Sequence, residues 1–407
     1  MGFFSSIANF FGGPSPQPAP VQNQRPQTNY VPPVANNNSG WSSQGGSGGV
    51  NWFDAADDSS SNDDENRTVY DLNGNPLQLG SREVKGSGGE GVVYSLPSNP
   101  KFLIKLYKGS TLGDDDKMSE IRKRIEDMVS IQALSKEKFV AWPIMPVANE
   151  NHEIIGFVMR KCEGVSFLAF RGPSSIKKHF PGWNRLDLVN VALDYVIKLK
   201  KLVKAGVLVN DFNPSNFLVT KDKKVSFIDC DSYQIPSASG GVNVSKTYFA
   251  SHVAPEILKN KSLLNKPRNI HQVEFGAALT VFQILMCGLH PYNFYDPQHK
   301  KACGTPDENL LKGFCPLGKG AGCLLPQGGW YNLWSYLTCS LKEQFINTFK
   351  KELGHSDPTK RVSLDDLEVE LNKLKAVMLK DKSRLSLCPT KPKSSEYRGK
   401  NKSSNCF

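Results

Sequence analysis

The sequence lacks any apolar stretch long enough to cross a lipid bilayer. Its longest apolar run, from Phe275 to Gly288, has 14 residues, whereas a membrane-spanning helix needs about 20. The chain also lacks a C-x-x-C pair, and the spacings of its nine cysteines fit no common zinc site. Its first residues have neither the positive segment nor the apolar core of a secretion signal. We therefore expect a cytoplasmic protein with reduced thiols.

Residues 12–66 contain few large apolar side chains and are rich in Pro, Gln, Asn, Ser and Gly, and then in Asp. Such a composition cannot bury enough apolar surface to offset the entropy cost of ordering, so we expect residues 1–66 to form a disordered extension. Residues 1–11 differ, because five apolar side chains fall on one helical face. They predict a short aromatic helix that docks peripherally on a membrane or on a partner; an inert terminus fits equally well. The five are Phe3, Phe4, Ile7, Phe10 and Phe11.

Positive charge is scarce in residues 1–78, which hold two basic and seven acidic residues. Because the whole chain carries +11, residues 79–407 carry +16. A basic globular part suits ATP, an acidic substrate, nucleic acid or an anionic membrane. Residues 379–407 hold eight Lys and Arg against two acidic residues, which predicts a flexible basic tail. A single tyrosine, Tyr397, interrupts this tail, so nucleic-acid binding is the less favoured interpretation.

Residues 79–375 have the patterning of a folded domain. Short apolar runs predict strands, and one amphipathic stretch among them, about 117–134, predicts a helix. From about residue 185 the pattern predicts mostly helices. We therefore expect an α+β fold with a small β-rich lobe, residues 79–162, and a larger helical lobe, residues 163–375. The predicted strands are 92–94, 102–104 and 154–159, and the later helices are 186–205, 273–288, 341–353 and 363–380.

A glycine-rich segment lies near the start of this domain. It reads Gly86-Ser87-Gly88-Gly89-Glu90-Gly91-Val92-Val93. Glycines let backbone N–H groups approach phosphate oxygens without interference from a Cβ atom. Because a strand follows, a hairpin over nucleotide phosphates is favoured over a dinucleotide-binding turn. Lys105 ends the next apolar strand, where its amine could neutralise the α- and β-phosphates. A flexible hairpin and a solvated lysine explain each signal equally well when it is taken alone.

A second cluster contains Asp211, Asn216 and Asp229. Phosphoryl transfer needs ligands for the metal ions that bridge the phosphates and a carboxylate that orients and deprotonates the attacking hydroxyl. Asp211 could supply the carboxylate base, and Asn216 and Asp229 offer the oxygen ligands that Mg²⁺ prefers. Two short strands flank Lys221–Lys223 and predict a hairpin that brings Asn216 and Asp229 side by side.

These residues resemble the motifs of the protein kinase superfamily. Asp211-Phe-Asn-Pro-Ser-Asn216 resembles the catalytic loop H-R-D-L-K-P-x-N, and Asp229-Cys-Asp231 resembles D-F-G. Ala254-Pro-Glu256 resembles the A-P-E motif, and Asp357-Pro-Thr-Lys-Arg361 resembles D-P-x-x-R. With the glycine-rich segment and Lys105, six motifs occur in the expected order over about residues 79–375. The chain looks closest to eukaryotic-like Ser/Thr kinases and, among them, to bacterial kinase-like proteins of the helix-hairpin-helix-associated type.

The resemblance implies a bilobal fold that transfers the γ-phosphoryl group of ATP to a protein hydroxyl, on Ser or Thr rather than Tyr, with Mg²⁺ or Mn²⁺. It implies that Asp211 is the base, that Asn216 and Asp229 hold the metal, and that Lys105 holds the α- and β-phosphates. The nucleotide would also contact the glycine-rich segment and Val93. A helix glutamate would pair with Lys105, and Glu126 is favoured over Glu120. A Glu256–Arg361 ion pair is expected as well.

Three positions depart from the family pattern. Asn210 replaces an arginine, so we expect activity without phosphorylation of the following segment. Asn213 replaces a lysine, which predicts slow turnover. Asp231 replaces a glycine and could either join the metal site or cap a turn. Three alternatives stay open: a pseudokinase that binds nucleotide as a scaffold, a kinase of small molecules, and a transferase of AMP. The oligomeric state is not determined by the sequence.

Overall fold

The computed structural model describes residues 68–83, 91–108, 112, 115–293, 295–296, 301–302, 304–318 and 329–393. These residues all belong to one unit of the chain, residues 60–407. The predicted N-terminal helix and disordered extension lie outside the described residues, and so does most of the glycine-rich segment.

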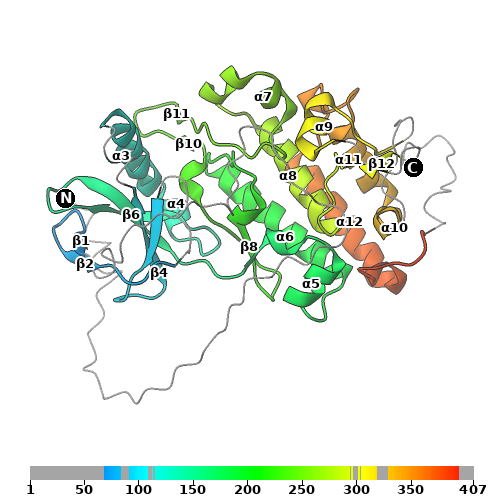
Figure 1. Ribbon diagram of the computed structural model, residues 1–407, viewed down its shortest axis with the longest axis horizontal. Coiled ribbons are helices and arrows are strands. Elements are labelled where there is room, and N and C mark those ends of the chain that lie inside the picture. Colours follow the sequence, from blue (N-terminus) through cyan, green and yellow to red (C-terminus); the bar gives the residue numbers. More distant parts are fainter. Residues whose placement is uncertain are drawn as a thin grey trace, which may run out of the picture. The chain divides into compact units, whose positions relative to one another are not determined.

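A six-stranded antiparallel sheet forms the first part of this unit, with the strand order β2-β1-β5-β6-β4-β3. Figure 1 shows the sheet beside helix α3 (Asp115–Ser130), and the short helix α4 (Gln132–Ser135) follows it. Helix α3 turns an apolar side toward the sheet, because Ile121 and Ile125 pack in one buried cluster with Phe157. The strands are β1 (Thr68–Tyr70), β2 (Pro76–Gln78), β3 (Gly91–Ser95), β4 (Phe102–Tyr107), β5 (Pro143–Ala148) and β6 (Ile154–Arg160).

Helices dominate the rest of the chain, and α6, α8 and α12 contact one another. The helices are α5 (Pro173–His179), α6 (Arg185–Lys204), α7 (Pro255–Lys259), α8 (Ile270–Leu285), α9 (Pro306–Lys312), α10 (Gly329–Ser335), α11 (Cys339–Phe349) and α12 (Leu364–Lys380). A small sheet has the order β7 (Val165–Ser166), β8 (Phe217–Val219) and β9 (Val225–Phe227). Two hairpins complete the unit, β10 (Ile235–Pro236) with β11 (Val242–Asn243), and β12 (Tyr295–Asp296) with β13 (Lys301–Ala302).

The predicted α+β fold is confirmed, with a β-rich N-terminal lobe and a helical C-terminal lobe. The sheet extends beyond the N-terminal bound expected for the lobe. The sheet begins at Thr68, before residue 79, because β1 pairs with β5 and therefore belongs to the folded unit. The helix expected over 117–134 is also divided, since α3 ends at Ser130 and α4 begins at Gln132.

The two lobes share a hydrophobic core and a backbone connection. Phe139 and Trp142, which follow α4, are buried in the same cluster as the helical lobe. The backbone N–H of Phe227 in β9 donates to Phe139 O at 2.7 Å, and Ala141 N donates to Phe227 O at 2.8 Å. Trp142 Nε1 donates to Met128 O of α3 at 2.8 Å. Strand β9 is thereby fixed against the end of α3, and the candidate site begins two residues after β9.

Part of the predicted flexible tail is bound to the domain. Asn332 Nδ2 of α10 donates to Pro389 O at 2.8 Å, and the backbone N–H of Lys393 donates to Ser335 Oγ at 2.9 Å. Arg384, which is 3% exposed, donates to Tyr336 O at 2.6 Å. These buried polar contacts order residues 381–393, so the tail is not flexible from residue 379 onward. Residues 394–407 lie outside the described residues.

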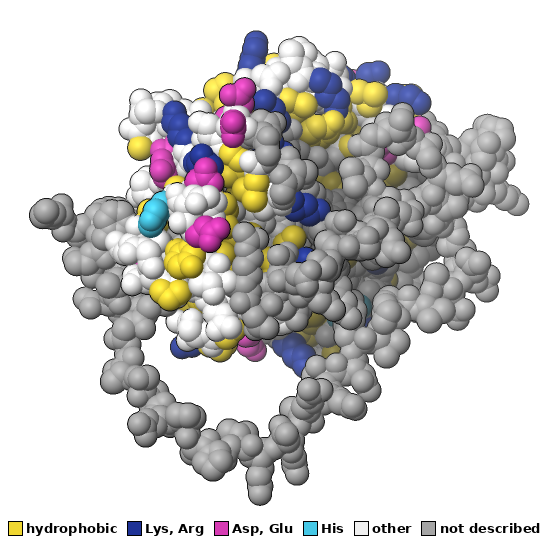
Figure 2. Space-filling model, turned by 60° about the vertical axis from the view of Figure 1, so that its left-hand side comes forward, with side chains coloured by type: hydrophobic (Ala, Val, Ile, Leu, Met, Phe, Trp, Pro, Cys, Tyr) yellow, Lys and Arg dark blue, Asp and Glu magenta, His cyan; other side chains and the backbone are white. Residues whose placement is uncertain are grey.

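Two further expectations concern cysteine and membrane association. Among the described residues five cysteines are free thiols, but Cys339 stands in a disulfide, so the expectation of reduced thiols is not met there. Among the described residues, no helix combines the length and the apolar character that spanning a membrane requires. On the face shown in Figure 2, Lys and Arg side chains lie among Asp and Glu side chains. The free cysteines are Cys162, Cys230, Cys287, Cys315 and Cys388.

Candidate active site

The β8–β9 hairpin brings two predicted ligand residues together. Phe217 of β8 lies opposite Phe227 of β9 in the antiparallel register. The pairing continues past the strands, because Ile228 N donates to Asn216 O at 2.9 Å. Asn216 directly precedes β8 and Asp229 directly follows Ile228. The predicted hairpin is therefore confirmed, and it places Asn216 and Asp229 on neighbouring chain segments.

Aromatic packing holds this hairpin in place. The ring of Tyr195 from α6 stacks on Phe227 with centroids 5.5 Å apart, and Phe217 meets Phe227 edge-on at 5.3 Å. Phe212 joins the same group, 6.4 Å from Phe217. Such buried aromatic pairs stabilise beyond the area that they bury. Asp211 directly precedes Phe212, so the backbone of the predicted base rests on a packed core.

The Asp211 carboxylate is buried and hydrogen-bonded at both oxygens. Its Oδ1 accepts from the backbone N–H of Asn213 at 3.1 Å, and its Oδ2 accepts from Asn216 Nδ2 at 3.1 Å. Burial raises the pKa of Asp211 to about 6, the two hydrogen bonds oppose the rise, and the negative charge of Asp229 adds to it. A carboxylate that titrates near neutral pH is suited to general-base chemistry.

Lys105 lies in β4 opposite Val93 of β3, and its amine points to two aspartates. Lys105 Nζ lies 2.8 Å from Asp229 Oδ1 and 2.8 Å from both carboxylate oxygens of Asp231. Burial alone would lower the pKa of Lys105, but the charges of Asp231 and Asp229 outweigh it and hold that pKa well above its usual value. The amine is therefore charged. Tyr107, two residues further along β4, donates its hydroxyl to Asp231 Oδ2 at 3.0 Å.

The two aspartates around Lys105 have different environments. Asp229 has a left-handed backbone, with φ 58° and ψ 43°, a conformation that costs a non-glycine residue free energy. A turn of 3₁₀ helix, Cys230–Ser232, follows it. The side chain of Asp229 is 45% exposed and that of Asp231 is 7% exposed. One short turn thus presents Asp229 outward and Asp231 inward while both contact Lys105.

The predicted pair between Lys105 and Glu126 is not formed. Glu126 and Glu120 are both exposed on α3, and the side of α3 that faces the sheet carries isoleucines instead. Asp231 occupies the position beside the amine that a helix glutamate was expected to take. Of the glycine-rich segment, Gly86 to Glu90 lie outside the described residues. Gly91 is buried in β3, where an added Cβ atom would lie 2.8 Å from Leu106 O.

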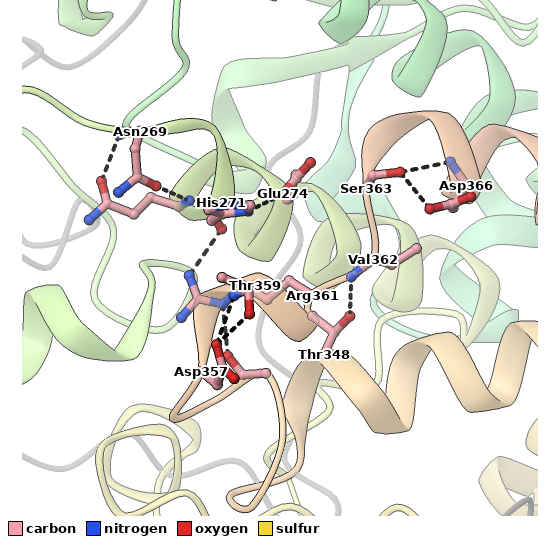
Figure 3. A network of polar contacts seen from close by, with 12 residues as sticks. Asn269, His271, Glu274, Thr348, Asp357, Thr359, Arg361, Val362, Ser363 and Asp366 are labelled. Carbon is pink, nitrogen blue, oxygen red and sulfur yellow. Dashed lines mark hydrogen bonds and ion pairs between the residues drawn. The ribbon is translucent and has the colours of Figure 1, made fainter.

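The expected ion pair between Glu256 and Arg361 is confirmed. Arg361 Nη1 lies 3.0 Å from Glu256 Oε1, and Nη2 lies 2.7 Å from Oε2. Arg361 also donates from Nη1 to His271 O at 3.0 Å, a contact drawn in Figure 3, and from Nε to Gly354 O at 2.8 Å. Burial would raise the pKa of Glu256, but Arg361 holds it below the usual value. The pair joins the start of α7 to the start of α8 and to the loop before α12.

The oxygen atoms near Asp211 suit a cation such as Mg²⁺ that takes only one or two ligands from the protein. Among the described residues, no group of three or more His, Cys, Asp and Glu side chains is arranged to hold a metal ion. Asn216 and Asp229 nevertheless offer an amide oxygen and a partly exposed carboxylate. Mg²⁺ is typically bound through one or two carboxylates together with water and substrate phosphates, so this pair fits it. Asp231, the third predicted metal ligand, has both oxygens on Lys105.

Sequence reasoning missed two residues of this site, Tyr107 and Arg124. The sequence could have placed Tyr107 beside Lys105, because residues two apart on a strand share a face and Tyr107 follows Lys105 by two. Arg124 of α3 donates to the backbone carbonyls of Tyr233 at 2.7 Å and Val244 at 2.8 Å. Because its acceptors are main-chain atoms distant in the sequence, no residue pattern could have identified them.

Comparison with known proteins gives two relatives. No family model matches the chain. Proteins from Escherichia coli O157:H7 and Escherichia coli strain K12, both named protein kinase YegI, are 28% and 29% identical to it over 230 and 232 residues. The matches cover 56% of this chain and 34% of each relative. The chain therefore spans about a third of the length of the relatives that it matches.

Proposed function

We propose, from the chain's place in the protein-kinase-like superfamily, that it transfers the γ-phosphoryl group of ATP to a protein hydroxyl, on Ser or Thr rather than Tyr. The names of the two relatives support a kinase activity. One observation carries the finer proposal, which is the convergence of Asp211, Asn216 and Asp229 next to the charged amine of Lys105. We place the reaction in the cytoplasm, as the sequence led us to expect.

In the proposed reaction the acceptor hydroxyl oxygen forms a bond to the γ-phosphorus, and the bond from that phosphorus to the β–γ bridging oxygen breaks. ADP leaves with the electron pair of that bond. Asp211 orients the hydroxyl and accepts its proton, which its raised pKa favours. Asn216 and Asp229 would hold Mg²⁺, which when bound neutralises charge on the phosphates. Lys105 would contact the α- and β-phosphates.

A second candidate is a scaffold that binds nucleotide with little turnover. Asn213 stands where the family has a lysine that contacts the transferring phosphate. Its Oδ1 accepts from the backbone N–H of Ser215 at 3.0 Å and so caps the turn Pro214–Asn216. A charge-assisted contact is worth about 1.5–3 kcal/mol, so its loss predicts slow transfer. We nevertheless favour the enzyme, because Lys105, Asp211, Asn216 and Asp229 are all retained.

The test uses ATP labelled at the γ-phosphate, with Mg²⁺ or Mn²⁺, and a generic protein acceptor. We expect labelling by the wild-type chain and a loss of about 100-fold or more in Asp211→Asn and Asp229→Asn. Asp222→Asn, an exposed aspartate in the turn of the same hairpin, is the matched control and should label as wild type does. Equal labelling by all four proteins would refute the enzyme proposal.

Two further measurements separate the alternatives. Binding of a fluorescent ADP analogue without any labelling would support the scaffold. Label transferred from ATP marked at the α-phosphate, and absent with the γ-label, would establish AMP transfer instead.

A further inference from the structure

We propose that Asp231, and not a glutamate of α3, is the carboxylate that positions Lys105 for nucleotide, and that α3 acts on this pair through Arg124. The kinetic consequences rest on the proposed function, whereas the pairing itself does not. Asp231 is here a positioning residue, because it acts through Lys105.

The contacts of Asp231 are directed at one amine. Both of its carboxylate oxygens lie 2.8 Å from Lys105 Nζ, and Tyr107 supplies a third hydrogen bond from the same strand. A buried ion pair with these additional hydrogen bonds restricts both side chains to one geometry.

In the short turn after β9, we assign Asp229 to the metal ion and Asp231 to Lys105. The two aspartates contact the amine through separate carboxylates, and the side chain of Asp229 is 45% exposed whereas that of Asp231 is 7% exposed. When Asp229 turns to a cation, as the proposed function requires, Lys105 loses one contact and keeps the two from Asp231. The amine therefore keeps its place without any carboxylate from α3.

Helix α3 reaches this turn with a cation. Arg124 Nη1 donates to Tyr233 O at 2.7 Å and to Asp231 O at 3.4 Å, and Nη2 donates to Val244 O at 2.8 Å. These acceptors lie on either side of the β10–β11 hairpin. The guanidinium therefore fixes the backbone that carries Asp231.

One turn further along α3, Asp127 holds the tip of the same hairpin. Asp127 Oδ1 accepts from Ala238 N at 2.9 Å, and Oδ2 accepts from Ser237 Oγ at 3.0 Å. A displacement of α3 would thus move the hairpin and, through its first residues, Asp231. The position of α3 therefore affects Lys105 indirectly. Arg124 on the helix holds the segment after β9, and Asp231 on that segment holds the amine.

The first test measures the Lys105 amine without nucleotide. The chain is labelled with ¹⁵N-lysine, and the Nζ signal of Lys105 is assigned by its absence in Lys105→Arg. We expect this signal to move in Asp231→Asn, which removes a charge 2.8 Å from Nζ, and to stay as in wild type in Glu126→Gln and in Asp116→Asn, an exposed control on α3. An unmoved signal in Asp231→Asn, or a moved one in Glu126→Gln, would overturn the proposal. This test does not need phosphoryl transfer, so it stands even if the proposed function fails.

The second test is kinetic. We expect Asp231→Asn to lower kcat/KM for ATP about tenfold or more, mainly through KM, because the lost contact is charge-assisted. In the Lys105→Met background, Asp231→Asn should cause no further loss, since it acts only through the lysine. If instead the two losses multiply and the half-saturating Mg²⁺ concentration rises, Asp231 is a metal ligand and the proposal is wrong. Thermal melting verifies that each variant is folded.

Discussion

Replacing Arg361 by methionine should destabilise the chain far more than its place in a loop suggests. The side chain of Arg361 is 0% exposed. It makes four hydrogen bonds, two to the Glu256 carboxylate and one each to the carbonyls of His271 and Gly354. Methionine fills a similar volume but donates nothing. The substitution therefore removes all the hydrogen bonds that Arg361 donates to the carboxylate and to the two carbonyls.

The magnitude follows from that loss. Removing one partner of a buried ion pair costs about 3–5 kcal/mol, out of a total stability of about 5–15 kcal/mol for a typical protein. An unfolding entropy of about 2.1 cal/mol/K per residue makes each kcal/mol lower the melting temperature of a unit of this size by about 1.5 °C, which gives a decrease of about 5–7 °C. The partly exposed Glu256 side chain, at 26%, can regain some hydration, so we expect the lower part of the energy range.

The assay is urea unfolding of the wild type, Arg361→Met and Lys360→Met, followed by fluorescence. Lys360 precedes Arg361 and makes one exposed ion pair with Asp357 at 3.5 Å, so it is a matched control. An exposed pair contributes about 0–1 kcal/mol. If Arg361→Met and Lys360→Met shift the midpoint equally, the reasoning is refuted.

The pH dependence of the stability gives a second, independent test of the Glu256–Arg361 pair. Arg361 holds the folded pKa of Glu256 below its usual value. The stability from this pair is therefore present above the unfolded pKa, about 4.3 for glutamate, and is lost as the pH falls through the folded pKa. The difference in unfolding free energy between wild type and Arg361→Met should shrink over that acidic range. A difference that stays constant there would contradict the assignment to Glu256.

Three further outcomes are expected. The kcat/KM for phosphoryl transfer should fall below about pH 6, because protonated Asp211 cannot accept the proton of the hydroxyl; a profile that is flat from pH 5 to 8 would contradict its role as base. Gly276→Ala should lower the melting temperature although alanine favours helix, because its Cβ would lie 2.4 Å from the ring of Phe212 and overpacking costs about 1–3 kcal/mol; Gly329→Ala, with open space at that position, should not lower it. Phosphatase treatment should leave the transfer rate unchanged, because Asn210 offers no cation to a phosphate; a rate that falls and returns on rephosphorylation would refute this.

Much of the architecture follows from local patterns. The helices over 186–205, 273–288 and 363–380 have long apolar repeats and appear within a few residues of the predicted ends, as α6, α8 and α12. Strand β5 was missed because Pro143 and Pro146 interrupt it. On the side of β1 only Ala148 has a ladder partner, so Pro143 and Pro146 lie along an unpaired edge of β5, where prolines are tolerated.

The candidate site was predicted where sequence neighbours decide the geometry. Asn216 and Asp229 flank one short hairpin, so their proximity follows from a local turn. The partner of Lys105 does not follow in this way, because Asp231 lies 126 residues away and its direction depends on the left-handed backbone of Asp229. The apolar pattern of α3 did indicate that Glu126 would not face Lys105. Glu126 directly follows the buried Ile125, which turns it away from the sheet.

The net charge of the candidate site bears on how nucleotide would bind there. Lys105 supplies one positive charge against the carboxylates of Asp211, Asp229 and Asp231. Asn213, where the kinase motif that the sequence resembles has a lysine, caps a turn and adds no charge. With Asp211 ionised, these four groups sum to a negative site, which repels a triphosphate unless a cation accompanies it. Nucleotide and divalent metal should therefore bind as one unit, with Asp229 as the exposed carboxylate that receives the metal and Asp231 as the buried one that keeps Lys105 in place.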